Sequence, residues 1–192
     1  MHPLLASISL RQALAAVPGL LEQTGVPPSG VHSLALDPGN GHRLGFHLGC
    51  GWSGVLDLAS QAVTHVHAPA HAFAGSNPAL AAGDADAAQM LLWGATAAAP
   101  ALHRRTCWAA GGRHFCVPSR RDDALMLLDF DASSDAGCYA LRDDDDSGRA
   151  TAPPAVHVAL TQPVVSVAAH PTGDMIVAGG LSSSMSLVTL PW

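Results

Sequence analysis

The stretch LGFHLGCGWSGVLDLAS, residues 44–60, decides how the chain is interpreted, because Gly49, Gly51 and Gly54 spell G-x-G-x-x-G within it. In a dinucleotide-binding loop, such glycines follow a strand and open a helix whose amino end binds the pyrophosphate. In a hairpin, the same glycines only allow the backbone to turn between two strands. The first alternative predicts an α/β nucleotide enzyme, and the second predicts an all-β protein.

The residues that follow the glycines favour the hairpin. The segment VLDLASQAV (55–63) offers only about two helical turns before the strand-like VTHVHAP (63–69) begins. A dinucleotide site also needs an acidic residue about 20 positions after its loop. The first acidic residue after Asp57 is Asp84, which is too distant. We therefore expect a strand, a turn and a second strand, and no nucleotide cofactor.

The same hairpin pattern recurs along the chain. Each copy consists of an apolar strand, a polar or glycine-containing turn and a second apolar strand. Turns are expected near positions 51, 86, 121 and 182, and the copies are residues 42–60, 113–133 and 173–190, with a weaker one at 79–93. An internal repeat of this kind is typical of architectures in which small sheets are stacked side by side.

A further strand precedes the best copies. VHSLALDPGNG (31–41) aligns with VVSVAAHPTGD (164–174), so that Ser33 matches Ser166 and Pro38 matches Pro171. Proline followed by glycine, asparagine or Thr-Gly is turn chemistry, because proline fixes one dihedral angle and the next residue is free. Both segments are therefore expected to be strands that end in the same kind of turn.

This order of strands and turns, with Leu56-Asp57-Leu58 closing one copy, resembles the WD-repeat family of β-propellers. Residues 166–190 match that pattern best, and the resemblance covers roughly residues 31–190. Leu56 and Leu128 stand where the family has tryptophan. The resemblance implies an all-β fold, a partial β-propeller of about four blades built from antiparallel hairpins. It also implies a non-catalytic scaffold that binds other proteins and holds no cofactor.

The expected organisation has two parts. Residues 1–30 form an N-terminal segment with a short helix or a residual strand, and residues 31–192 form the blades, interrupted by an acidic loop insertion at 132–154. Closed propellers have about 4–8 blades, and WD-type rings commonly have more blades than this chain supplies. We therefore expect further blades from a longer chain or a partner, although pairing of two chains and a small irregular fold are alternatives.

Charge and hydropathy exclude other classes of protein. The formal net charge of -6 argues against a nucleic-acid-binding protein, which would need a basic surface. No apolar run reaches the ~18 residues that span a bilayer. The four cysteines form no C-x-x-C pair, so we expect reduced thiols in an intracellular protein, cytoplasmic or nuclear.

Two sets of residues are candidates for function. Arg120 and Arg121 occupy an expected hairpin tip, where they either contact an acidic partner or pair locally with Asp122 and Asp123. Trp52 is a further candidate for partner contact.

The alternative function depends on THVHAPAH, residues 64–71. His65 and His67 share one face of an expected strand and His71 follows closely, a pattern that can bind zinc or copper. This pattern would indicate a metal-binding protein or a metal-dependent enzyme on a β scaffold. Accidental pairs are expected among eleven histidines, so the scaffold remains the favoured interpretation.

Overall fold

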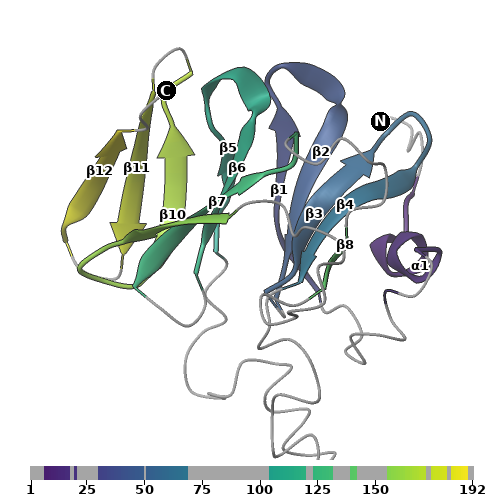
Figure 1. Ribbon diagram of the computed structural model, residues 1–192, viewed down its shortest axis with the longest axis horizontal. Helices are drawn as coiled ribbons and strands as arrows, with labels where there is room; N and C mark the ends of the chain where they lie inside the picture. The colour runs from purple at the N-terminus through teal and green to yellow at the C-terminus, as the bar shows by residue number, and fades with distance from the viewer. Residues whose placement is uncertain are drawn as a thin grey trace, which may run out of the picture.

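A computed structural model describes residues 7–17, 20, 30–49, 51–68, 104–119, 123–131, 139–141, 155–171, 174–180 and 183–189. These residues form an all-β protein of three sheets that stand side by side in a row (Figure 1), as the sequence predicts. Neighbouring strands are antiparallel, except that β8 is parallel to β4. The predicted fourth hairpin, at residues 79–93, lies outside the described residues.

In each sheet, the first strand along the chain pairs with the strand that follows it in sequence. The first sheet contains β1 (Val31–Asp37), β2 (Asn40–Leu48), β3 (Ser53–Asp57), β4 (Ala62–Ala68) and β8 (Tyr139–Leu141). The second contains β5 (Cys107–Trp108), β6 (His114–Pro118), β7 (Ala124–Asp129) and β9 (Ala155–Ala159). The third contains β10 (Val164–Ala169), β11 (Met175–Gly180) and β12 (Met185–Thr189). A short 3-10 turn, η3 (Ala110–Gly112), joins β5 to β6.

Two glycines of the opening motif have structural roles: Gly51 makes a turn, and Gly54 leaves room for the Phe46 ring. Gly51 has φ +97 and lies between β2 and β3, where the Leu48 amide donates to the carbonyl of Trp52 at 2.8 Å. Gly54 lies inside β3, and a Cβ added there would come within 2.5 Å of the Phe46 ring. A strand therefore follows the glycines, as the hairpin interpretation predicts, and no helix opens at Gly54.

The two segments that align in sequence share a structural irregularity. In β1 the register with β2 shifts between Val31 and Ser33, and in β10 the register with β11 shifts between Val164 and Ser166. A register shift at matching positions indicates that the two strands are copies of one structural unit. The alignment therefore holds in three dimensions.

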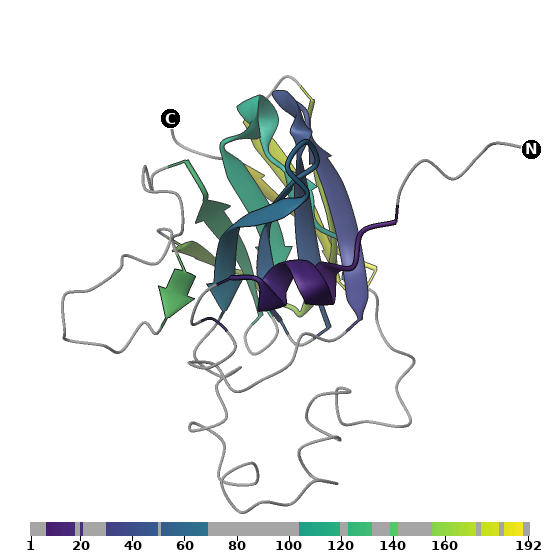
Figure 2. The same ribbon diagram turned by 90° about the vertical axis from the view of Figure 1, so that its right-hand side faces the viewer.

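The core is divided among the spaces between layers. One cluster of apolar residues lies between the first and second sheets, and another lies between the second and third. A third covers the outer face of the first sheet, where α1 (Leu10–Ala15) packs through Leu14 (Figure 2). Ser9 caps this helix by accepting a hydrogen bond from the Gln12 amide. None of the helices in the described part of the chain is long and apolar enough to cross a membrane.

Two features differ from the sequence-based expectation or extend it. The segment 132–154 is not a loop throughout, because β8 adds a parallel strand beside β4. The outer face of the third sheet also exposes apolar side chains, with Met185 77% and Leu187 63% exposed. Val177 pairs with Leu187 on that face and is itself 38% exposed.

The contact beneath Phe46 gives the first prediction. Replacing Gly54 by alanine should lower the free energy of unfolding by about 1–3 kcal/mol, because the new Cβ meets the Phe46 ring and the His65 carbonyl. The control is Gly41→Ala on β2, where nothing lies within 4 Å of an added Cβ. That variant should stay within about 0.5 kcal/mol of the parent in urea unfolding. Equal effects of the two substitutions would contradict this account.

Candidate functional site

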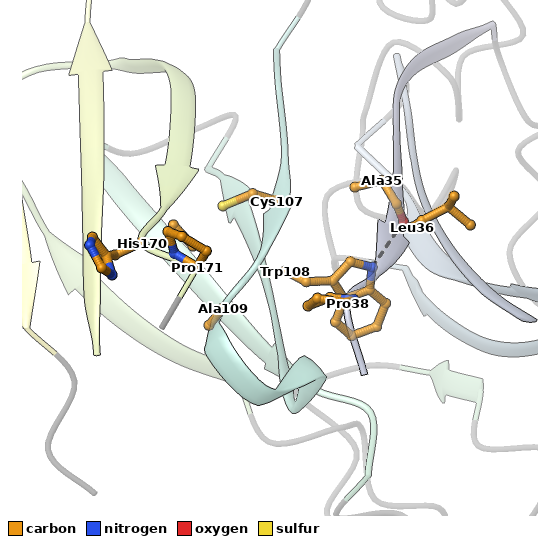
Figure 3. A pocket seen from close by; sticks show the side chains of 9 residues that line it. Ala35, Leu36, Pro38, Cys107, Trp108, Ala109, His170 and Pro171 are labelled. Atoms are coloured by element: carbon orange, nitrogen blue, oxygen red, sulfur yellow. Dashed lines mark hydrogen bonds between the residues drawn. The ribbon is translucent and has the colours of Figure 1, made fainter. Parts of the chain in front are cut away.

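The first strands of the three sheets end around one pocket. Its volume is about 250 Å³, and it is open to solvent. Three segments line it, each at the end of β1, β5 or β10: Ala35, Leu36 and Pro38; Cys107, Trp108 and Ala109; Ala169, His170 and Pro171 (Figure 3). Pro38 and Pro171 are the matched turn residues of the two aligned segments, so the repeat itself places equivalent turns at this pocket.

Hydrogen bonds from the start of β5 hold the three strands together. The Arg105 amide donates to the carbonyl of Val165 at 3.0 Å, which joins the second sheet to the third. On the other side, the Thr106 amide and hydroxyl both lie 3.0 Å from the Ser33 hydroxyl of the first sheet. The segment before the pocket is therefore bonded to both neighbouring sheets.

Trp108 forms the wall between the first and second sheets. Its indole N–H donates to the carbonyl of Ala35 at 2.9 Å, the bond drawn in Figure 3. Its ring packs against Phe115 with the centroids 4.9 Å apart, and the guanidinium of Arg43 lies 5.1 Å from the ring centroid. A buried tryptophan usually satisfies its N–H in this way. Contacts to both sheets therefore hold Trp108 in place at this side of the pocket.

Arg43 joins charged groups from both sheets behind that wall. Its guanidinium lies 3.1 Å from the carboxylate of Asp37 and 2.9 Å from that of Asp131. Asp37 also accepts a hydrogen bond from the Gly39 amide at 2.7 Å. Gly112 has φ +73, and its missing side chain leaves room for the Asp37 carboxylate. The turn after β1 and the turn before β6 are therefore fitted to each other.

Trp52, a candidate for partner contact, is buried. Its side chain is 0% exposed and packs with Leu14 and Val66 in the cluster beneath α1. In this position it stabilises the first sheet and offers no surface to a partner. Arg120 and Arg121 lie outside the described residues.

The histidines of the metal hypothesis are only partly described. His65 and His67 lie on β4 opposite Val55 and Ser53, so they share one face as predicted. His65 is hydrogen-bonded to Thr64 at 2.9 Å, and His71 lies outside the described residues. Within the described residues, no group of three or more histidine, cysteine, aspartate or glutamate side chains could hold a metal ion.

Sequence reasoning found the matched turns at Pro38 and Pro171 but missed the part of the pocket that the second sheet contributes. β5 is only two residues long, and neither Trp108 nor Cys107 stands out by hydrophobic pattern. A signal was nevertheless present, because Ala110-Gly111-Gly112 follows Trp108 much as a proline-containing turn follows Leu36 and Ala169.

Comparisons with known proteins concern the fold. No protein-family model matches the sequence, and no curated protein matches it. Among solved structures, the chain is similar to the β-propeller domain of Cps50 (Swd1) from Myceliophteria thermophila, with 12% identity and a TM-score of 0.41. The match covers 85% of this chain and 40% of that one.

The charges behind Trp108 give a second prediction. Arg43→Met should lower the free energy of unfolding by roughly 3 kcal/mol, because it leaves the buried Asp37 carboxylate without its cation. Arg113→Met is the control, because Arg113 also pairs with a buried carboxylate, that of Asp129, but is itself 60% exposed. Without Arg113, Asp129 keeps the hydrogen bond from the Asp131 amide and the neighbouring His114 ring. This control should cost less than about 1 kcal/mol. Urea unfolding at pH 7 measures both, and a loss from Arg113→Met as large as that from Arg43→Met would overturn the assignment.

A third prediction concerns pH. Burial lowers the pKa of His65, Arg43 lowers it further and Asp131 raises it. Burial also lowers the pKa of His114. Because the unfolded chain binds protons at these sites at higher pH than the folded chain does, stability should fall as pH drops below about 6.5.

His65→Gln should therefore make the free energy of unfolding less dependent on pH between 7 and 5, with His114 supplying the remaining dependence. Urea unfolding at several pH values measures the slope. A slope unchanged by His65→Gln would show that His65 does not change protonation on folding.

Proposed function

We propose that the chain is a non-catalytic protein–protein interaction scaffold of the WD-repeat β-propeller type, acting inside the cell, and that the pocket at the ends of β1, β5 and β10 is its contact site. One observation carries the proposal. The ends of the first strands of all three sheets converge on one open pocket, and two of these strands, β1 and β10, are copies of one repeat. When repeated units place equivalent turns side by side, the turns together form one binding surface.

The chemistry of the pocket fits a peptide side chain. Alanine, leucine, proline and tryptophan side chains line most of it, and His170 adds a polar group. A volume of about 250 Å³ is small for a drug-sized ligand, but it suits one anchoring side chain of a partner protein. The formal net charge of -6 disfavours nucleic acid as the partner.

The exposed outer face of the third sheet indicates that the array of sheets continues beyond β12. Met175, Val177, Met185 and Leu187 form an apolar face on β11 and β12. A blade normally hides such a face against the next blade. We infer that a further blade, from a longer chain or from a partner, covers this face.

The pocket proposal is tested with a matched pair of substitutions on β1. Leu36 is 57% exposed and lines the pocket, whereas Leu34 is 54% exposed on the same strand and lies outside it. Leu36→Asp should weaken partner binding by about tenfold or more, because a charge then sits at an apolar contact. Leu34→Asp should leave binding within about twofold.

The measurement is affinity purification with the tagged chain from its native cells, followed by binding titration of the recovered protein against both variants. Circular dichroism of each variant verifies its folding. Equal binding by the two variants would refute the pocket as the contact site.

A further inference from the structure

We propose that Cys107 and Cys116 form an oxidisable dithiol, a modification site at the pocket wall that a peroxide converts into a disulfide between β5 and β6. The starting observation is the register of these strands, in which the two cysteines are direct partners. Both thiols are free in the structure. The proposal is independent of the proposed scaffold function.

The backbone places the two sulfurs within reach of a bond. Directly opposed residues of antiparallel strands have Cα atoms about 4.5–5.5 Å apart. Disulfides form when this separation is about 4.4–6.8 Å. A disulfide between Cys107 and Cys116 therefore needs rotation of side chains and little movement of the strands.

The two thiols differ in the way that a two-step oxidation requires. Cys107 is half-buried and lines the open pocket, so a small oxidant can reach it, whereas Cys116 is 0% exposed. A hydrogen bond with Cys116 lowers the pKa of Cys107, and the Ala169 amide lowers it further, whereas burial opposes both effects. The hydrogen bond with Cys107 and burial raise the pKa of Cys116. Cys107 is thus the thiol that reacts first.

Figure 3 shows how Cys107 is presented. Its side chain points to the opposite side of β5 from Trp108, toward the third sheet, where Pro171 and His170 lie. On that side Cys107 and Cys116 pack with Val164 and Val167. The dithiol is therefore held by the core between the second and third sheets, with one sulfur open to the pocket.

The chemistry balances with one peroxide. The Cys107 thiolate attacks an oxygen of hydrogen peroxide, the O–O bond breaks, and a sulfenic acid and hydroxide form; the hydroxide takes a proton to become water. Cys116 then attacks the Cys107 sulfur, the S–O bond breaks, and hydroxide leaves with the proton of Cys116 as a second water. The two sulfurs together lose two electrons, which the peroxide gains.

The test uses the full chain with Cys50→Ser and Cys138→Ser, which leaves Cys107 and Cys116 as its thiols. The reduced protein is treated with hydrogen peroxide at pH 7 and then alkylated. Trypsin cleaves after Arg105 and Arg113, so the two cysteines fall in different peptides. We expect the intact mass to fall by two hydrogens and the two peptides to remain linked until dithiothreitol is added.

Two controls assign the roles. With Cys116→Ala, the link should vanish and Cys107 should accumulate as a sulfenic acid that dimedone labels. With Cys107→Ala, dimedone labelling should be slower by about tenfold or more, because Cys116 is buried.

Several outcomes would overturn the proposal. One is an absence of linked peptides from the folded protein although Cys107 is oxidised. Another is a link that forms between two molecules, seen as a dimer on non-reducing gels. A third is equal dimedone labelling of the two single-cysteine variants.

Discussion

Contact between the first two sheets depends on an aromatic cluster that fits against a glycine. Trp108, Phe115 and Phe130 pack with ring centroids 4.9–6.3 Å apart, and a Cβ on Gly45 would lie 2.5 Å from the Phe115 ring. Aromatic pairs in such tilted arrangements stabilise a core beyond the area they bury. Because Trp108 also bonds to the carbonyl of Ala35, the same cluster fixes the strand ends that surround the pocket.

The features that the sequence predicted well are local ones. The turn at Gly51 and the strand after it follow from nearby residues alone, because a dinucleotide loop would have needed a helix that the following segment could not form. The matching of residues 31–41 with 164–174 was also local, and the structure adds a shared register shift before Ser33 and Ser166. A turn depends on a few adjacent residues, and it can therefore be predicted without knowledge of the fold.

The features that the sequence did not predict depend on distant contacts. Trp52 was a candidate for partner contact, but α1 and β4 enclose it. β5 is too short to show any periodicity, and it exists because both neighbouring sheets bond to the residues that precede and form it. β8 pairs with β4 although 73 positions separate the paired residues Val66 and Tyr139. Single-sequence patterns contain no record of such pairings.

The division of the pocket among three sheets links binding to folding. No one sheet holds more than a third of the nine lining residues, and the pocket exists only while both interfaces between sheets are intact. A molecule that occupies it therefore has affinity for the assembled row and little for separated hairpins. A ligand that binds only the assembled sheets stabilises them by mass action. The melting temperature would therefore rise as the ligand concentration increases.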